Sequence, residues 1–186
     1  GRVIEAPAIE FADLLEQNLS RIEAALHTAG EHEGWLVLPS PTAAQYFCEA
    51  LARMRLKPSD LQRLSIATIG EAGAQRLGGS GLTVRFQPPE PRGDVLAETL
   101  PAAPGSSVVI LGSQQSRPEL REGLARRGVR VSTVALYAPG PCDAGLASMR
   151  DALLQRRAQP TSERGPWLLV VSSPSGVDAI ADRFAP

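Results

Sequence analysis

The chain has 186 residues, of which 43% are hydrophobic and 21% charged, so it can bury one sizeable core or two small ones. Its 19 basic and 20 acidic residues leave a formal net charge of −1, which gives no positive field to collect nucleic acid. No apolar run approaches the roughly 18 residues that a membrane-spanning helix needs, so we expect neither nucleic acid nor a membrane as a partner.

Most of the chain alternates between helices and short apolar strands. Leucines and an isoleucine at helical spacing predict a helix over residues 12–29. Apolar strands are predicted after it at residues 36–38, 66–69, 82–84, 108–111 and 129–136, with helices between them at residues 42–55, 71–77, 93–100 and 117–127. This alternation is typical of a parallel sheet covered on both faces, and right-handed crossovers then make a doubly wound α/β domain.

Three of these strands run directly into a small or polar turn and then a helix. The turns are Pro39-Ser40-Pro41, Gly70-Glu71 and Gly112-Ser113. Because the strands of a parallel sheet all end at the same edge, we expect the turns to meet where open α/β folds bind ligands.

The last part of the chain is less regular. Residues 140–143 form a cluster of strand-breaking residues, and a helix is predicted after it at residues 146–157. A polar stretch that contains proline, residues 159–166, then leads to a predicted strand at residues 167–171.

A short internal repeat links the two parts. The segment from Trp167 to Pro174 matches the segment from Trp35 to Pro41 with one residue inserted. Chance and a repeated α/β unit both explain so short a match. Position favours the repeat, because Ser40 and Ser173 would each cap a helix that begins with proline.

The sequence has no familiar motif for binding nucleotides or catalytic metals, and no serine-hydrolase motif. His27 and His32 are explained better as surface residues than as metal ligands, because the predicted helix ends between them. Cys48 lies among apolar residues of a predicted helix, and its distance in sequence from Cys142 gives no disulfide framework. We expect no metal, no cofactor and a reducing, cytoplasmic setting.

Anion binding by the turns is a second interpretation beside simple helix capping. Backbone N–H groups and the positive end of a helix dipole attract anions without lysine or arginine. The turns at Ser40, Gly70, Gly112 and Ser173 offer such groups. Every α/β protein has capped helices, however, and from spacing alone the plain structural interpretation is the stronger one.

Tyr137 is also open to two interpretations. It follows a predicted strand and precedes the cluster at residues 140–143, so it lies at a domain boundary. An aromatic side chain there can simply pack a hinge. A phenol can also donate a hydrogen bond or a proton to a leaving hydroxyl.

Several runs of residues, in the right order along nearly the whole chain, resemble the uroporphyrinogen-III synthase family. They are residues 66–74, 81–84, 93–96, 120–131 and 134–137, together with Pro88 and Ser173-Pro174-Ser175-Gly176. The resemblance implies two doubly wound α/β domains with parallel sheets, joined by a connector of two strands, with a cleft between them.

Mapped onto this chain, the resemblance gives four segments. Residues 1–10 would form the first connector strand and residues 11–130 the continuous domain. Residues 131–141 would form the second connector strand. Residues 142–186 would be part of a split domain, and we expect the remainder of that domain to lie outside this sequence at both ends.

The function implied is that of a cyclising hydro-lyase. Family members convert hydroxymethylbilane to uroporphyrinogen III, with loss of water and inversion of the last pyrrole ring, and need no cofactor or metal. The resemblance assigns Tyr137 to assisting departure of the hydroxyl in a monomeric enzyme. The residues implied to bind the polycarboxylate substrate are Ser40, Thr42, Gly70, Glu71, Gly73, Gly112, Ser113, Ser173, Ser175 and Gly176.

Two departures from the family pattern keep alternatives open. The family often has threonine at the position of Gly73, so one side-chain hydrogen bond to substrate is in doubt. The usual threonine after Tyr137 is replaced within residues 138–141, which can stiffen a hinge. A non-catalytic relative that senses a ligand, and an unrelated binding protein with two hinged lobes, are the alternatives.

Overall fold

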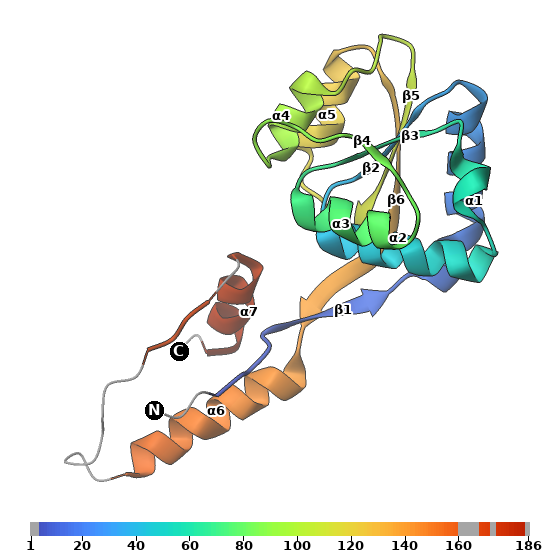
Figure 1. The fold of residues 1–186 in the computed structure, drawn as a ribbon. Coiled ribbons are helices and arrows are strands. Elements are labelled where there is room, and N and C mark those ends of the chain that lie inside the picture. Colours follow the sequence, from blue (N-terminus) through green and yellow to red (C-terminus); the bar gives the residue numbers. More distant parts are fainter. Residues whose placement is uncertain (1–3, 160–167, 172–173, 185–186) are drawn as a thin grey trace. The chain divides into compact units, whose positions relative to one another are not determined.

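The computed structural model describes residues 4–159, 168–171 and 174–184, except for the side chains of residues 174 and 175 (Figure 1). The chain divides into two compact units. One comprises Asp13–Ala138, and the other comprises Gly1–Ala12 together with Pro139–Pro186.

The described elements follow one another in the order expected for an α/β protein. They are β1 (Ile9–Asp13), α1 (Leu15–Glu31), β2 (Trp35–Leu38), α2 (Pro41–Met54), a 3-10 turn (Pro58–Leu61), β3 (Ser65–Thr68), α3 (Glu71–Gly79), β4 (Val84–Phe86), α4 (Gly93–Thr99), β5 (Ser107–Ser113), α5 (Glu119–Arg126), β6 (Arg130–Pro141), α6 (Asp143–Ala158) and α7 (Pro174–Phe184).

The strands form one sheet of six strands in the order β1-β6-β5-β2-β3-β4. The pairs β6–β5, β5–β2, β2–β3 and β3–β4 are all parallel, which confirms the predicted parallel sheet. Strand order reverses at β2, because β3 follows it on one side while β5 lies on the other. The chain therefore has a topological switch point between β2 and β5.

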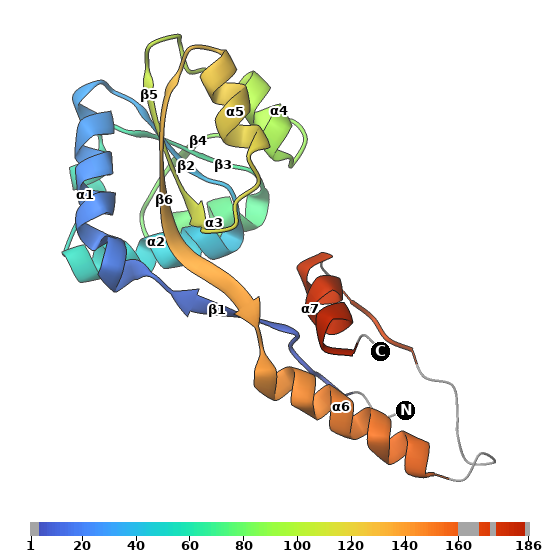
Figure 2. The ribbon, with the colours of Figure 1, turned by 180° about the vertical axis from the view of Figure 1, so that it is seen from behind.

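Helices cover both faces of this sheet (Figures 1 and 2). Leu36 and Leu38 of β2 point to one face and pack with side chains of α1, α2 and α3. Val37, between them in sequence, points to the other face and packs with α4 and α5. Each fully buried leucine or valine contributes roughly 1.5–3 kcal/mol, so both layers stabilise the sheet edge where β2 ends.

The predicted strand at residues 82–84 begins two residues too early. The N–H of Leu82 donates to the carbonyl of Leu77 at 3.0 Å, and Gly81 adopts a φ of +78°. These residues therefore end α3 with a turn that glycine favours, while the Leu82 side chain packs into the core. The strand can begin only after that turn, at Val84.

Two further strand predictions need correction. Within the described part of residues 1–10, only Ile9 and Glu10 belong to a strand, because β1 begins at Ile9 and continues to Asp13. Residues 168–171, predicted as a strand, have no regular structure, and Leu168 is 87% exposed. A strand needs a partner, and none of the strands in the described part of the chain pairs with this segment. Trp167 lies outside the described residues.

The unit formed by the two ends of the chain contains α6 and α7. The N–H of Cys142, just before α6, donates to the carbonyl of Ala8 at 3.0 Å. Gly145 allows α6 to approach the same segment, since a Cβ there would meet the carbonyl oxygen of Pro7 at 1.9 Å. Residues 7–8 and the start of α6 are thus packed backbone against backbone.

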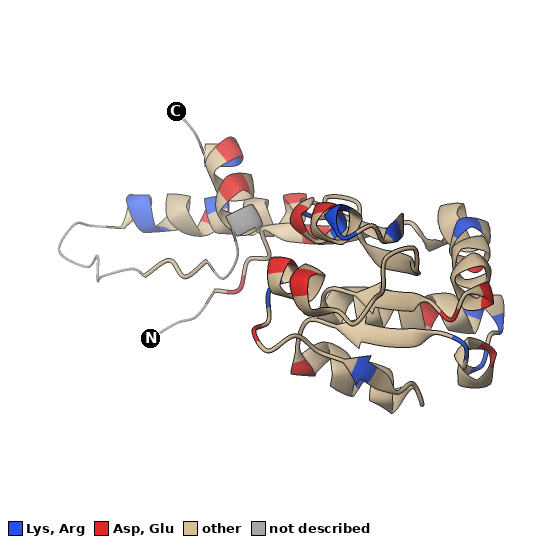
Figure 3. Ribbon diagram, turned by 90° about the horizontal axis from the view of Figure 1, so that it is seen from above, with Lys and Arg blue, Asp and Glu red and all other residues tan. Residues whose placement is uncertain are grey.

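Charged residues of both signs occur on the helices, as Figure 3 shows, whereas β2, β3 and β5 carry none. Among the residues that the structure describes, every helix is too short or too polar to cross a bilayer.

Candidate functional site

The turns that follow β2 and β5 lie side by side at the switch point. A Cβ placed on Gly112, at the end of β5, would lie 3.3 Å from Cγ of Pro39. Glycine at this position lets the β5 turn approach the β2 turn closely. The structure therefore brings Ser40 and Gly112-Ser113 to one edge of the sheet, as the sequence predicted.

Ser40 holds the start of α2. Its backbone is extended, and its Oγ accepts a hydrogen bond from the N–H of Ala43 at 3.0 Å, while Pro41 occupies the first helical position. This is the predicted cap, with serine before proline. Ser40 is half-buried. Because its oxygen is the acceptor in the cap, its hydroxyl hydrogen can still be donated to a second partner.

That partner is Tyr137. The hydroxyl oxygens of Ser40 and Tyr137 are 3.2 Å apart, and either hydroxyl can donate. Tyr137 lies in β6 opposite Ser113 of β5, and its carbonyl accepts from the N–H of Gln114 at 2.8 Å. The tyrosine is only 6% exposed, and its backbone is held by the pairing of β5 with β6.

A second tyrosine, Tyr46 of α2, completes the surroundings of Tyr137. The two rings are stacked, with centroids 5.0 Å apart and planes inclined by 25°. Burial raises the pKa of Tyr46, and the carboxylates of Asp13 and Glu49 act in the same direction. The sequence analysis missed Tyr46, because nothing in its helical spacing distinguishes a ring that packs on Tyr137 from an ordinary half-buried residue.

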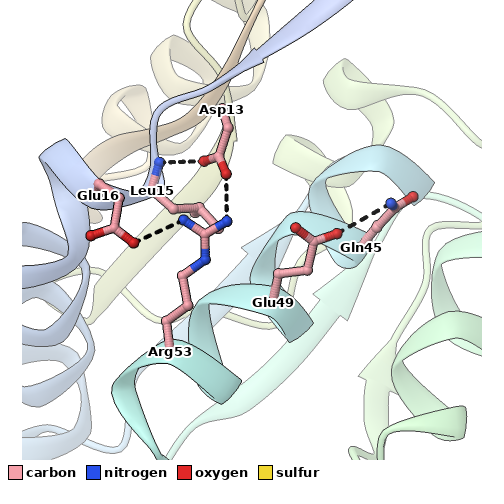
Figure 4. A network of polar contacts seen from close by, with 6 residues as sticks. All are labelled: Asp13, Leu15, Glu16, Gln45, Glu49 and Arg53. Carbon is pink, nitrogen blue, oxygen red and sulfur yellow. Dashed lines mark hydrogen bonds and ion pairs between the residues drawn. The ribbon is translucent and has the colours of Figure 1, made fainter.

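A polar network anchors α2 beside this pair (Figure 4). Arg53 donates to Asp13 at 2.5 Å and to Glu16 at 3.1 Å, and the N–H of Leu15 donates to the other oxygen of Asp13 at 2.7 Å. Although burial alone raises the pKa of Asp13, the hydrogen bonds from Leu15 and Arg53 lower it below its ordinary value. The network ties the last turn of α2 to the start of α1.

The turn after β3 is built differently. Gly70 precedes α3 with an extended backbone, and the N–H groups of Gly73 and Ala74 both donate to its carbonyl. A Cβ on Gly73 would lie 2.4 Å from Oγ1 of Thr68, a fully buried hydroxyl that donates to the carbonyl of Leu38 at 2.8 Å. Thr68 thus occupies the space that a side chain at position 73 would need.

Several polar groups of the Gly112-Ser113 turn form hydrogen bonds with neighbouring residues of the same turn. The hydroxyl oxygen of Ser113 accepts from the N–H of Gln115 at 3.1 Å, and its carbonyl accepts from the hydroxyl of Ser116 at 2.6 Å. The Ser113 hydroxyl hydrogen remains a donor for a ligand.

The remaining predicted site residues are divided between the two units. Thr42 and Glu71 lie in the first turns of α2 and α3. Ser175 lies in the first turn of α7, where side chains are not described, and Gly176 follows it as a buried residue. Ser173 is outside the described residues.

The chemistry of this edge is that of hydroxyls and backbone amides. The turn segments at residues 39–42, 70–73 and 112–113 contain no lysine or arginine. His27 pairs with Glu31 at 3.6 Å on an exposed helix surface. Across residues 4–159, 168–171 and 174–184, no three His, Cys, Asp or Glu side chains come together as metal ligands would.

The fold resembles that of solved structures, among them three from Thermus thermophilus. A mutant uroporphyrinogen III synthase from Thermus thermophilus matches with a TM-score of 0.59 and 16% identity, over 95% of this chain and 66% of that one. The wild-type enzyme in another crystal form matches with a TM-score of 0.54 and 17% identity, over 98% and 65%. A third Thermus thermophilus structure gives 0.53 and 18%, over 82% and 58%.

At these identities the structures establish the shared fold, and the chain spans about two thirds of their length or less. A family model described as uroporphyrinogen-III synthase HemD matches residues 1–186. Because that match covers the whole sequence, the chain belongs to the uroporphyrinogen-III synthase family.

Proposed function

We propose that this protein cyclises hydroxymethylbilane to uroporphyrinogen III, with loss of water and inversion of the last pyrrole ring. Membership of the family supports the reaction class. The observation that carries the proposal is the hydroxyl pair of Tyr137 and Ser40, 3.2 Å apart at the sheet edge where α/β folds bind ligands.

Tyr137 assists departure of the substrate hydroxyl in this proposal. The carbon–oxygen bond of the hydroxymethyl group breaks as electrons from the adjacent pyrrole nitrogen form a new carbon double bond, and the proton that this nitrogen releases leaves with the hydroxyl as water. Tyr137 donates a hydrogen bond to that oxygen as negative charge develops on it.

Ser40 keeps the phenol in position during this step. The oxygen of Ser40 already accepts from the N–H of Ala43, so its own O–H is free to donate to the Tyr137 oxygen. The Tyr137 O–H can then point to the substrate. Hydrogen bonds in such a chain strengthen one another, which favours donation to the leaving group.

Main-chain N–H groups hold the substrate carboxylates. In the first turn of α2, Pro41 has no N–H, and those of Ala43 and Ala44 donate to Ser40, which leaves the N–H of Thr42. In α3, the N–H groups of residues 73 and 74 donate to residue 70, which leaves those of Glu71 and Ala72. Helix dipoles make these donors favourable for anions.

Selection of one conformer is the main catalytic task. A linear tetrapyrrole closes its own ring, so an enzyme controls which carbon of the last pyrrole ring forms the new bond by fixing the geometry of the chain. Several carboxylates bound along one sheet edge restrict that geometry at several points. This demands few acidic or basic side chains, in agreement with the composition of the edge.

The finer description of fold and setting is part of the same proposal. Residues 11–130 form one doubly wound domain and residues 142–186 part of a second, and the segments at residues 1–10 and 131–141 connect them. The protein acts as a cytoplasmic monomer on a small molecule, without nucleic acid. The formal charge of −1 supports the last point.

Product analysis tests the function. The protein is supplied with hydroxymethylbilane, the products are oxidised, and the isomers are separated by chromatography. We expect the type III isomer to predominate over the symmetrical type I isomer, which forms without an enzyme. A product mixture equal to that of the control without protein contradicts the proposal and leaves a non-catalytic ligand-sensing domain as the alternative.

A further inference from the structure

Helix α2 contacts Tyr137 at two separate points. Ser40, at its N-terminus, meets the phenol oxygen, and Tyr46, about two turns later, stacks on the ring. We infer that Tyr46 is a positioning residue, which holds the Tyr137 ring in the orientation that presents its hydroxyl to Ser40 and to the substrate. This inference rests on the proposed function and assigns a new residue to it.

The geometry of the two rings supports this role. A centroid distance of 5.0 Å with planes inclined by 25° is an offset stack, the arrangement that aromatic pairs prefer. A single hydrogen bond leaves the ring of a tyrosine free to tilt about the bond axis. A second contact against the ring face removes that freedom, so the oxygen and the ring are fixed together.

The platform that carries Tyr46 is itself fixed. Glu49 and Arg53 follow Tyr46 at three and seven residues along α2, which places all three on one side of the helix. Arg53 is bonded to Asp13 and Glu16, as Figure 4 shows, so that side of α2 is held against the start of α1. Tyr46 therefore presents a ring of fixed position to Tyr137.

The state of Tyr46 also suits a positioning role. Burial, followed by the negative charges of Asp13 and Glu49, raises the pKa of its phenol, while Arg53 opposes them. The ring stays neutral at physiological pH and offers a face for stacking. Its contribution is thus the ring itself, which gives a clear contrast between substitutions that keep the ring and those that remove it.

Kinetics of three variants test the inference. Tyr46→Phe keeps the ring, and we expect kcat within about twofold of the wild type. Tyr46→Leu removes it, and we expect kcat to fall about tenfold with KM changed less than about twofold, in line with the energy of an aromatic pair. When Tyr137 is already replaced by Phe, Tyr46→Leu should lower kcat by less than a further factor of about two, because the hydroxyl that Tyr46 positions is gone.

Fluorine NMR supplies a readout that does not depend on the reaction. The chain has two tyrosines, so Tyr46→Phe and Tyr46→Leu each leave Tyr137 as the sole site for 3-fluorotyrosine. We expect a ring-current shift of the Tyr137 signal in Tyr46→Phe that is lost in Tyr46→Leu. Tyr46→Met, also unbranched at Cβ, replaces Tyr46→Leu if the latter does not fold.

Equal fluorine shifts in the ring-keeping and ring-removing variants, or equal kcat values, overturn the inference. A lower melting temperature with unchanged kcat also overturns it, since Tyr46 would then be merely structural. If the wild type forms no type III isomer, the proposed function fails, and the fluorine spectra alone decide whether Tyr46 orders Tyr137.

Discussion

Helices α2 and α3 begin at the same sheet edge, one strand apart, but in different ways. At α2 a side chain does the capping: Ser40 accepts from Ala43 and meets the Tyr137 hydroxyl 3.2 Å away. At α3 the capping position is Gly70, and the helix packs so closely on β3 that Thr68 fills the space beside Gly73. The capping residue of α2 contacts the side chain of Tyr137, whereas the capping residue of α3 has only backbone groups to offer.

This difference separates two tasks that a single sheet edge can perform. A serine cap with a second partner links the position of the helix to the phenol of Tyr137. A glycine start leaves main-chain donors uncovered for an anion. The predictions below test each half of this comparison.

The largest effect is expected at Tyr137. Tyr137→Phe keeps the ring stacked on Tyr46 but removes the hydroxyl, so we expect kcat to fall about 100-fold, as loss of a hydrogen-bond donor to a leaving group does. The melting temperature should stay near that of the wild type, because the buried ring and its stack on Tyr46 are kept. Turnover and thermal unfolding of the same samples check this, and a large loss of stability would return Tyr137 to a packing role.

A side chain at position 73, in the first turn of α3, should destabilise the fold. In Gly73→Ala the new Cβ would meet the Thr68 hydroxyl at 2.4 Å, so we expect a loss of about 1–3 kcal/mol in the free energy of unfolding. Gly78 in the same helix has nothing within 4 Å of its Cβ position, and Gly78→Ala should stabilise by up to about 1 kcal/mol. Urea unfolding measures both, and equal effects would contradict the close packing described.

Substitutions at the two capping positions should change the free energy of unfolding by smaller amounts and in opposite directions. Ser40→Ala should cost about 1 kcal/mol of stability, because α2 loses its side-chain acceptor. Gly70→Ser should gain a few tenths of a kcal/mol, since the backbone of Gly70 is already extended and its Cβ position is open. Urea unfolding checks both, and destabilisation by Gly70→Ser would show that this start requires glycine.

The start of α1 offers a third case, because the carboxylate of Asp13 accepts from the N–H of Leu15 and makes the contact dependent on pH. The pKa of Asp13 is lower in the folded protein than its ordinary value of 3.8, so the unfolded chain binds the proton more readily. The stability from Asp13 is therefore complete above about pH 4 and is lost as the pH falls through the lowered value. At neutral pH Asp13→Asn should cost less than about 1 kcal/mol, since the ion pair is partly exposed.

Urea titrations between about pH 2 and 7 compare wild type with Asp13→Asn. The variant should lose less stability on acidification than the wild type does. Parallel curves would show that Asp13 has the same pKa in both states.

The central strands and their turns could be predicted because both leave a local pattern in the sequence. Buried strands of a parallel sheet read as continuous apolar runs, as at residues 36–38 and 108–111, and the topology then brings their turns together. The edge strands were harder. β1 has the sequence IEFAD, in which apolar and acidic residues are mixed, and β4 is shifted because Leu82 serves the end of α3.

The candidate site was predictable only in outline. Ser40 and Tyr137 are 97 residues apart, and their contact depends on the pairing of β5 with β6 and on the direction of α2. The stack of Tyr46 on Tyr137 and the approach of Thr68 to Gly73 have the same origin. Such contacts follow from side-chain packing in three dimensions, which periodicity does not encode.

The most direct test of the account asks where a polycarboxylate binds. Uroporphyrin III, the stable oxidised form of the proposed product, is titrated into 15N-labelled protein, and amide shifts are followed by NMR. We predict the largest shifts at the N–H groups of Thr42, Glu71 and Ala72, with a smaller response at Ser113. Shifts confined to residues away from these turns, or no saturable shift, would contradict the claim that backbone donors at this sheet edge hold the substrate.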